Sequence, residues 1–393
     1  MVAYTEYPTD PRVRREAETL VAEGYRVYVI SAMPRTGRSP AHMGGVHLYE
    51  IPLTIRRGGG LRYMYQYALF FFLSSALLMR LHHRTRFSLI HVHSLPDFQV
   101  FCASPFKVFR IPVLLDLHEA MPEILIARFH KSTGSIWFRL AALVERLSCL
   151  FADHVVAAND GIRETVVSRG IPASHVTAVY NAYDGAPPTL SSDAVRREFG
   201  LPRGRLLVHA GGINAERDLE TLLRAVARLS SQPDLIVVIA GEGRPEYLQT
   251  LRQLGEDLHL QDRLRFIGRI PLEQARALSA LSELGVVTLE SNPLTQLAWP
   301  TRILEFVAFR RPLIVPDLPL IRRVLGDAAR YYTPGDATSL AEQLDLAFRH
   351  PESLESKVND AARACQRFES RQVRTALLSI CQSVEALQAA RSA

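Results

Sequence analysis

Residues 206–218 read LLVHAGGINAERD, a strand pattern that runs through a glycine turn into a helical pattern. Leu206–Ala210 has the length and apolar content of a buried strand, and a helical pattern follows the turn. In the turn, Gly211 and Gly212 let backbone amides approach a ligand, and the start of a helix favours an anion. Arg217 can donate two hydrogen bonds to a phosphate. The stretch therefore predicts a strand–turn–helix unit with an anion-binding turn, although a plain tight turn would use the same glycines.

Short β-rich runs alternate with helical patterns along the whole chain, which predicts parallel sheets with crossover helices. In the first half we expect strands at 26–30, 88–92, 112–117, 154–157 and 176–180, and helices at 11–23, 62–83, 136–151 and 161–169. In the second half we expect strands at 206–210, 235–240, 264–267, 284–289 and 313–315, and helices at 216–229, 246–258, 272–281, 301–309 and 339–349. The predicted class is α/β, with two Rossmann-like, doubly wound parallel-sheet domains facing each other across a cleft.

The domain boundary is expected where the periodicity stops, in a segment rich in proline, glycine and serine. We predict an N-terminal domain at 1–184, a linker at 185–195 and a C-terminal domain at 196–368. A final helix at 369–393 is expected to pack back toward the N-terminal domain. The first strand is expected to be truncated, because residues 1–4 read as the end of a strand that a loop and a helix follow at once.

Composition limits the classes of protein. The chain has 393 residues, with 48% hydrophobic and 22% charged residues, which indicates a folded protein of two or three domains. The net charge of +6 comes mostly from arginine, and no run of like charge resembles a tail that binds nucleic acid. The four cysteines lack disulfide or zinc-site spacing, and the first residues do not resemble a signal peptide. We therefore expect a cytoplasmic protein that does not bind nucleic acid.

One apolar segment allows three interpretations. Residues 63–79 are nearly all apolar or aromatic and lie between Arg62 and Arg80, at the short limit for a membrane-spanning helix. A spanning helix would place the flanking segments on opposite sides of the membrane and break up the predicted domain. A buried helix and a helix that also contacts the membrane surface through residues 56–86 both remain open.

The strongest functional signal is residues 300–317, which read PTRILEFVAFRRPLIVPD. They predict a helix start followed by a proline-led strand. The free amides of Thr301 and Arg302 would face an anion, and Glu305 could accept hydrogen bonds from the ribose hydroxyls of a nucleotide. Two further turns follow predicted strands, at 241–243 and at 268–270, where ordinary turn chemistry is the alternative.

In order and spacing, these motifs resemble glycosyltransferase family 4, a retaining family with the GT-B fold and many members in bacterial cell-surface glycan synthesis. The family pattern runs G-R-L-x-x-x-K-G, G-x-G-P, F-x-G-x-V and E-x7-E. In the first half, residues 10–15, 115–123, 152–156 and 179–184 are similar to it as well. The resemblance implies transfer of a sugar from a nucleoside diphosphate sugar to a glycan or lipid-linked acceptor.

The resemblance also implies roles for single residues. Arg217 stands at the phosphate-binding lysine, Glu305 at the glutamate on the donor ribose, and His118 at a histidine that faces the donor sugar and acceptor. The expected catalytic residues are Arg217, His118 and Glu305. The expected donor-binding residues are Gly211, Gly212, Gly241, Gly243, Arg269, Ile270, Glu290, Thr301, Arg302 and Glu305. On the acceptor side we expect Arg12, His118 and Glu119.

Some positions depart from the family pattern. Gly212 replaces the arginine of G-R-L, Leu297 replaces the first glutamate of E-x7-E, and Arg310 replaces a glycine. Glu290 or Asn292 could supply the lost carboxylate contact. Family branches with a P-x-K-x-x-E pattern lack that glutamate, and residues 300–305 are similar to them.

Three functions follow as alternatives. We expect a hexosyltransferase that needs no metal or other cofactor, because the chain contains no D-x-D motif. A non-catalytic sugar-nucleotide-binding or scaffolding homologue, and a nucleotide-sugar epimerase, remain open. A dehydrogenase is disfavoured because no G-x-G-x-x-G opens a helix after a first strand.

Overall fold

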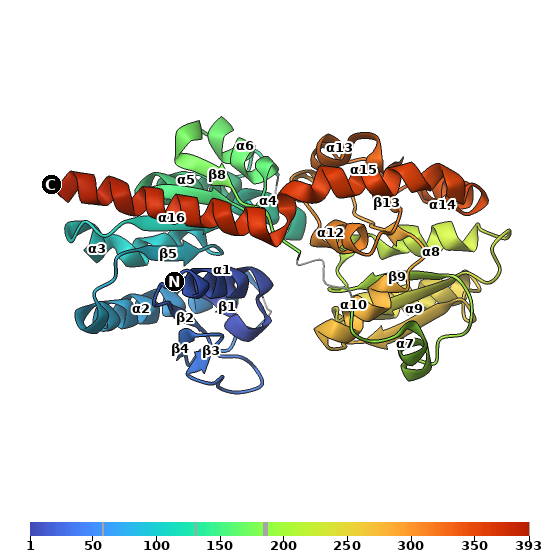
Figure 1. The fold of residues 1–393 in the computed structure, drawn as a ribbon, viewed down its shortest axis with the longest axis horizontal. Coiled ribbons are helices and arrows are strands. Elements are labelled where there is room, and N and C mark those ends of the chain that lie inside the picture. Colours follow the sequence, from blue (N-terminus) through green and yellow to red (C-terminus); the bar gives the residue numbers. More distant parts are fainter. Residues whose placement is uncertain (57–58, 130–131, 184–187, 393) are drawn as a thin grey trace. The chain divides into compact units, whose positions relative to one another are not determined.

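The computed structural model describes residues 1–56, 59–129, 132–183 and 188–392, which form two units (Figure 1). The first unit comprises Met1–Asn181 with Arg371–Ala393, and the second comprises Ala182–Ser370. The boundary therefore precedes the expected linker at 185–195, of which 185–187 lie outside the described residues. Residues 192–195 are not linker, because helix α7 (Ser192–Glu198) begins there; the Ser191 side chain accepts a hydrogen bond from the Ala194 amide.

The first unit is built on one eight-stranded sheet with the order β3-β4-β2-β1-β5-β6-β7-β8. The strands are β1 (Val2–Glu6), β2 (Tyr28–Ala32), β3 (His42–Met43), β4 (Val46–Ile51), β5 (Ile90–His93), β6 (Val113–Leu117), β7 (His154–Ala157) and β8 (Val176–Ala178). Only β3 pairs antiparallel, with β4, through a turn in which Gly44 and Gly45 have φ of 59° and 78°. Our sequence analysis missed this hairpin, although Val46 and Leu48 alternate with more exposed residues as in a half-covered strand.

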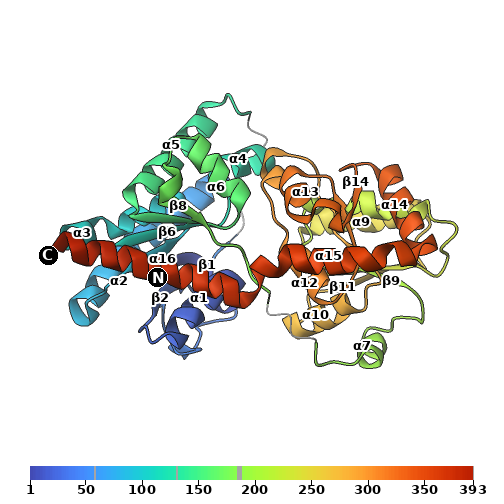
Figure 2. The same cartoon turned by 45° about the horizontal axis from the view of Figure 1, so that its top comes forward.

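Helices cover both faces of this sheet (Figures 1 and 2). They are α1 (Pro11–Ala22), α2 (Gly60–Thr85), α3 (Ser104–Val108), α4 (Met121–Phe129), α5 (Ile136–Phe151), α6 (Asp160–Ser168) and α16 (Ser370–Ser392), with a 3₁₀ segment η2 (Asp97–Ala103). The side chain of Asp10 caps α1 by accepting from the Arg12 and Val13 amides. The chain returns to this unit in α16, where the Tyr25 hydroxyl lies 3.0 Å from the Glu385 carboxylate.

Among the described helices, α2 alone has the length and apolar composition to cross a membrane. It connects β4 to β5, which lie in the same sheet, and Phe70, Leu78 and Leu81 on one of its faces belong to the core of the unit. Because both of its ends join one sheet, α2 is a crossover helix.

The second unit holds two three-stranded parallel sheets, with orders β11-β10-β9 and β12-β13-β14. The strands are β9 (Leu206–Ala210), β10 (Ile236–Ala240), β11 (Leu264–Gly268), β12 (Gly285–Val286), β13 (Leu313–Pro316) and β14 (Arg330–Tyr332). The expected strand at 284–289 is thus reduced to two residues. Beside it, the Ser282 hydroxyl accepts from the Val208 amide at 3.1 Å, so a side chain replaces the backbone carbonyl that a continuous ladder would supply.

One hydrophobic core joins the two sheets, with Leu207, Ile239, Val286 and Ile314 in the same cluster. The helices of this unit are α7, α8 (Leu219–Ala227), α9 (Pro245–Asp257), α10 (Leu272–Ala280), α11 (Pro293–Gln296), α12 (Thr301–Ala308), α13 (Pro319–Leu325), α14 (Ala337–Arg349) and α15 (Glu355–Cys365), with a 3₁₀ turn η4 (Ala215–Arg217).

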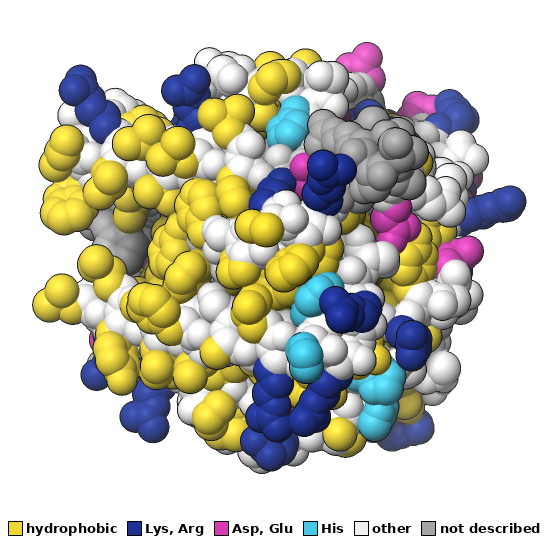
Figure 3. Space-filling model, turned by 90° about the vertical axis from the view of Figure 1, so that its left-hand side faces the viewer, with side chains coloured by type: hydrophobic (Ala, Val, Ile, Leu, Met, Phe, Trp, Pro, Cys, Tyr) yellow, Lys and Arg dark blue, Asp and Glu magenta, His cyan; other side chains and the backbone are white. Residues whose placement is uncertain are grey.

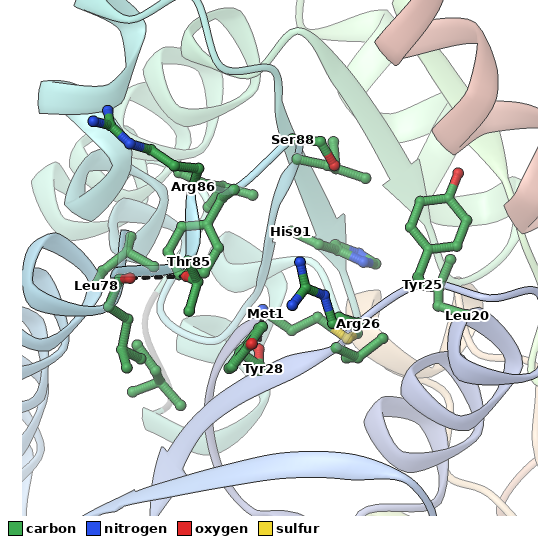
Figure 4. A pocket seen from close by; sticks show the side chains of 16 residues that line it. Met1, Leu20, Tyr25, Arg26, Tyr28, Leu78, Thr85, Arg86, Ser88 and His91 are labelled. Carbon is green, nitrogen blue, oxygen red and sulfur yellow. Dashed lines mark hydrogen bonds between the residues drawn. The ribbon is translucent and has the colours of Figure 1, made fainter. Parts of the chain in front are cut away.

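A cavity of about 190 Å³ lies in the first unit, at the amino ends of β1, β2 and β5 (Figure 4). Met1, Tyr28 and His91 are among the residues that line it. Ligands of doubly wound sheets bind at the opposite, carboxyl edge. The candidate site therefore lies at the carboxyl ends of the strands in each unit, away from this cavity.

Candidate active site

Three glycine turns meet at the carboxyl ends of β9, β10 and β11. The Gly211 amide donates to the Ala240 carbonyl at 2.8 Å, and the Gly241 amide donates to the Gly268 carbonyl at 2.7 Å. A Cβ atom on Gly241 would lie 1.8 Å from the Gly211 carbonyl oxygen, a distance no side chain tolerates. The first two turns therefore require a glycine at 241 to come together.

The neighbouring glycines differ in what they require. A Cβ on Gly243 would lie 2.4 Å from the Ile213 carbonyl oxygen, so this position also depends on close backbone packing. At Gly212 the nearest atom to a Cβ would be Nδ2 of Asn214, at 3.4 Å. A Cβ on Gly212 would thus make only an ordinary van der Waals contact.

The expected nucleobase segment follows directly on the third turn. Arg269 is 66% exposed, and its Nη1 lies 3.3 Å from the Glu242 carboxylate on the neighbouring turn. Ile270 packs against the core of the β9–β11 sheet. The segment is therefore anchored by Ile270 while Arg269 remains at the surface.

The Gly211 turn and the start of α12 meet at the Arg302 side chain. Nη2 of Arg302 donates to the Ala210 carbonyl, and a Cβ on Gly211 would lie 2.5 Å from that nitrogen. Nη1 is buried and has no hydrogen-bond partner in the described part of the chain. Sequence analysis assigned a role to the backbone amide of Arg302; its side chain also joins the two stretches and keeps one donor for a further acceptor.

Arg217 lies close to Arg302. It ends η4, and its carbonyl accepts from the Thr288 hydroxyl at 2.6 Å. Burial and, to a smaller degree, the Arg217 charge lower the pKa of Arg302 to about 10, against the opposing effect of Glu305. Two cations are thus held near one another, an arrangement that an anionic ligand would stabilise.

Glu305 follows Thr301 and Arg302 by one turn of α12. Burial raises the pKa of its carboxyl, whereas Arg302 and Arg276 lower it. Arg276 of α10 donates from Nε and Nη2 to the Tyr183 hydroxyl, at 3.2 and 3.0 Å. Sequence analysis missed Arg276, because a single arginine on an amphipathic helix carries no motif.

The segment after β12 lies beside η4. The Glu290 amide donates to the Glu216 carbonyl at 3.3 Å, and Glu290 accepts from Nδ2 of Asn292 at 2.8 Å. Asn292 forms a capping box with Thr295 at the start of α11. Since Asn292 caps a helix, Glu290 is the better placed of the two residues expected to replace the glutamate that is absent at Leu297.

The site residues of the first unit gather at the end of β6. Nε2 of His118 lies 3.1 Å from Nδ1 of His93, and the His118 amide donates to the Ser94 hydroxyl at 3.1 Å. The His118 side chain is 22% exposed. His118 and its neighbour Glu119 are therefore accessible at the carboxyl edge, as a substrate-facing role requires.

Arg12 does not share this exposure. It is 4% exposed; its Nε and Nη2 donate to the two oxygens of Asp116 at 2.9 and 2.7 Å, and Nη1 donates to the Val179 carbonyl at 2.9 Å. All three guanidinium nitrogens of Arg12 thus bond within the protein, so on the expected acceptor side Arg12 acts as a structural residue. Burial alone would raise the pKa of Asp116, but Arg12 and His118 hold it well below its usual range.

Behind this pair lies a buried cluster of Glu16, His91, His93 and Asp116, whose ligand-type atoms lie within 4.8 Å of one another. The set would suit a divalent cation by donor type. Arg12, however, already binds both oxygens of Asp116 and lies 3.2 Å from Glu16, so it takes the place of that cation. Burial raises the pKa of Glu16 to about 8 and lowers that of His93 to about 4, which makes both groups largely uncharged at neutral pH.

Comparison with known proteins agrees with this organisation. A family model described as "Glycosyl transferase 4-like domain" matches residues 9–182, and one described as "Glycosyl transferases group 1" matches residues 192–364. N-acetyl-alpha-D-glucosaminyl L-malate synthase of Bacillus anthracis is 24% identical over 184 residues, which are 46% of each chain. Alpha-D-kanosaminyltransferase of Streptomyces kanamyceticus is 24% identical over 268 residues, 65% of this chain and 66% of that relative. The matches thus span about half to two thirds of these curated relatives.

Solved structures share the fold over nearly the whole chain. HepE of Anabaena in complex with UDP has a TM-score of 0.74 at 15% identity, covering 97% of this chain and 98% of that chain. Sucrose-phosphate synthase of Thermosynechococcus elongatus has a TM-score of 0.76 at 15% identity, covering 98% and 99%. The two matched domain models show that the chain belongs to glycosyltransferase family 4, and the shared architecture shows the GT-B fold.

Proposed function

We propose that the chain is a retaining glycosyltransferase that moves a hexose from a nucleoside diphosphate sugar to a glycan or lipid-linked acceptor in cell-surface polysaccharide synthesis. The family supports transfer as the reaction class. HepE, which shares the fold, was solved with UDP and with UDP-glucose, and this supports a nucleoside diphosphate sugar as donor.

A single observation carries the proposal: the Gly211–Arg217 turn and the start of α12 meet at the Arg302 side chain. Arg302 donates to Ala210 from one nitrogen and has a second, buried nitrogen without a partner in the described residues. Arg217 contributes a second cation nearby. Phosphate oxygens fit such donors, because guanidinium groups bind them in a planar, charge-assisted geometry.

The difficult step is departure of the nucleoside diphosphate from the anomeric carbon, because negative charge accumulates on the leaving phosphate. Fixed donors aimed at that charge lower the barrier, and one donor contributes about 2.7–4 kcal/mol in well-studied sites. Arg217, the Arg302 side chain and the first amides of α12 would supply this stabilisation. With two guanidinium groups there, the proposed reaction needs no metal to neutralise the diphosphate.

The remaining residues bind the other parts of the substrates. Glu305 would accept from the ribose hydroxyls, with Arg302 and Arg276 favouring its ionised form. Gly241, Gly243, Arg269 and Ile270 would surround the nucleotide. In the first unit His118 and Glu119 would face the transferred sugar and the acceptor.

A lipid-linked acceptor places the enzyme at the cytoplasmic face of a membrane, with contact through residues 56–86. Of this segment, residues 57–58 lie outside the described residues. Exposed Leu61, Tyr65 and Phe72 on α2 support such a contact.

The test begins with a thermal-shift screen of nucleoside diphosphate sugars, since a ligand that binds the folded state raises Tm. Release of nucleoside diphosphate is then measured for the selected donor with Arg217→Ala and Glu305→Ala. We expect at least a hundredfold loss for Arg217→Ala, the effect of about 2.7 kcal/mol. Near-native rates in both variants would refute the site.

Two departures favour a second function, a sugar-nucleotide-binding protein without turnover: Gly212 and Leu297 each remove a charged group of the family pattern. Calorimetric binding of the donor, with no product on any lipid or glycan acceptor, would support this function. Conversion of the donor sugar without an acceptor would instead identify an epimerase.

A further inference from the structure

Helix α5 presents an apolar face to the outside of the first unit. Its outward hydrophobic side chains are 48–71% exposed and recur at helical spacing; they are Ile136, Trp137, Leu140, Leu143, Leu147 and Leu150. The opposite face, with Glu145, Ser148 and Cys149, is buried. Surface helices normally direct polar residues outward, so α5 has the reverse pattern. Contiguous exposed apolar groups of this kind mark a binding surface.

Two other helices of the first unit expose similar residues. They are Leu61, Met64, Tyr65, Phe72, Leu73 and Met79 on α2, and Val108 and Phe109 at the end of α3. All three helices pack against η2. Figure 3 shows hydrophobic side chains gathered over one half of this side of the molecule, with Lys and Arg side chains at the margins. We call the exposed hydrophobic residues of α2, α3 and α5 named above the outer apolar surface.

The charges on this surface have one sign. The sequence of α2 contains neither Asp nor Glu, and the one acidic residue of α5, Glu145, is 1% exposed and paired with Arg169. The outward charged side chains of these two helices are arginines: Arg62, Arg80, Arg84, Arg139 and Arg146. The surface is therefore apolar and cationic.

We propose that the outer apolar surface docks on an anionic lipid bilayer, with α5 lying in the headgroup region. Leucines and a tryptophan interspersed with arginine are typical of helices that lie in a membrane interface, and anionic headgroups complement the arginines. In a symmetric dimer formed through α5, Arg139 and Arg146 would instead face the same arginines of the second copy, and the like charges would repel each other. The proposed docking thus adds α5 to the membrane contact expected for residues 56–86. The role of this docking in reaching a lipid-linked acceptor rests on the proposed function, whereas the docking itself does not.

The fluorescence of Trp137 on α5 can report this membrane contact. It has two tryptophans; Trp299 is 7% exposed, whereas Trp137 is 55% exposed. With vesicles of phosphatidylcholine and phosphatidylglycerol, we expect the full-length protein to co-sediment and its tryptophan emission to shift to the blue. Trp137→Phe should abolish the shift while co-sedimentation persists. Vesicles of phosphatidylcholine alone should bind several-fold less protein.

Matched variants distinguish docking through this surface from nonspecific adsorption to vesicles. Leu140→Gln with Leu147→Gln, and separately Arg139→Glu with Arg146→Glu, should lower the vesicle-bound fraction at least fivefold. Leu272→Gln, at a residue that is 72% exposed on α10, should leave it unchanged. Absence of binding to anionic vesicles, or a dimer in sedimentation velocity that the α5 variants dissociate, would overturn the proposal. UDP, GDP and ADP titrated into the same variants test the nucleotide site independently: vesicle docking without binding of any of the three would count against the proposed function alone.

Discussion

Nδ1 of His93 lies 3.1 Å from Nε2 of His118, and the two nitrogens lie 3.3 and 3.6 Å from Oδ2 of Asp116. Burial holds the pKa of His93 at about 4, so its ring is neutral near pH 7. Nδ1 of His93 faces both the Asp116 carboxylate and the His118 ring, and this contact fixes the orientation of His118. His93 is thus a positioning residue for His118.

Replacing His93 tests this relationship. His93→Leu should lower kcat about tenfold, the effect of losing one hydrogen bond of roughly 1.4 kcal/mol, with little change in nucleotide affinity. His93→Asn keeps a polar group near the position of Nδ1 and should restore part of the rate. Steady-state kinetics and calorimetry measure the two effects. Equal kcat for His93→Leu and the unaltered chain would remove the positioning role.

The glycine turns make a stability prediction. Gly241→Ala should lower the free energy of unfolding by about 3 kcal/mol, because its Cβ would meet the Gly211 carbonyl at 1.8 Å. Gly212→Ala, with 3.4 Å of clearance, should stay within about 0.5 kcal/mol of the unaltered chain. Urea unfolding measures both. Similar midpoints for the two variants would contradict the packing described.

The departure at Gly212 can be reversed. Gly212→Arg should tighten binding of the nucleoside diphosphate about tenfold, because one charge-assisted hydrogen bond adds roughly 1.4 kcal/mol. Gly212→Gln, of comparable length but uncharged, is the control for side-chain bulk. Calorimetric Kd values should separate the two. If arginine and glutamine act alike, no phosphate lies beside this position.

Glu16 makes stability depend on pH. Burial raises its pKa from the ordinary value of 4.5 to about 8 in the folded chain, so its stabilising contribution is complete below the unfolded value and is lost as the pH rises through the folded value. Glu16→Gln mimics the protonated form. The free energy of unfolding of this variant, relative to the unaltered chain, should therefore increase by a few kcal/mol between about pH 5 and about pH 9. Glu18→Gln, at a more exposed position on α1, is the control for the substitution itself.

Sequence patterns predicted the parts of the fold that depend on local periodicity. The strand–glycine–helix unit at 206–218 appears as β9, η4 and α8, and α5 occupies the expected residues 136–151. In the missed β3–β4 hairpin, β3 has two residues, too few for a periodic pattern, whereas β4 has six and carries the alternation at Val46 and Leu48. The shortening of 284–289 to β12 was not predicted; it occurs beside a hydrogen bond from Ser282 to Leu206 of β9 across 76 residues of chain, and no local pattern encodes that contact.

The candidate site shows the same division. Motif spacing indicated Arg217, Glu305 and His118. The contacts of neighbouring residues, however, depend on packing between segments that lie far apart in the sequence. Arg12 resembled a substrate-facing residue in sequence, and its partner Asp116, 104 residues away, makes it a buried structural cation. The sequence of α5 shows that it is rich in apolar residues, but only the structure shows that many of them are exposed to solvent.

We propose that the Gly211–Arg217 turn and residues 300–305 bind one nucleoside diphosphate together. The most direct test is the calorimetric Kd of whichever of UDP, GDP and ADP the thermal-shift screen selects. We expect one site per chain, with affinity at least about tenfold weaker in Arg217→Ala and in Glu305→Ala. Arg349→Ala, at a 60% exposed arginine on α14, should leave it unchanged. Unchanged affinity in both site variants would show that these two segments do not bind the nucleotide.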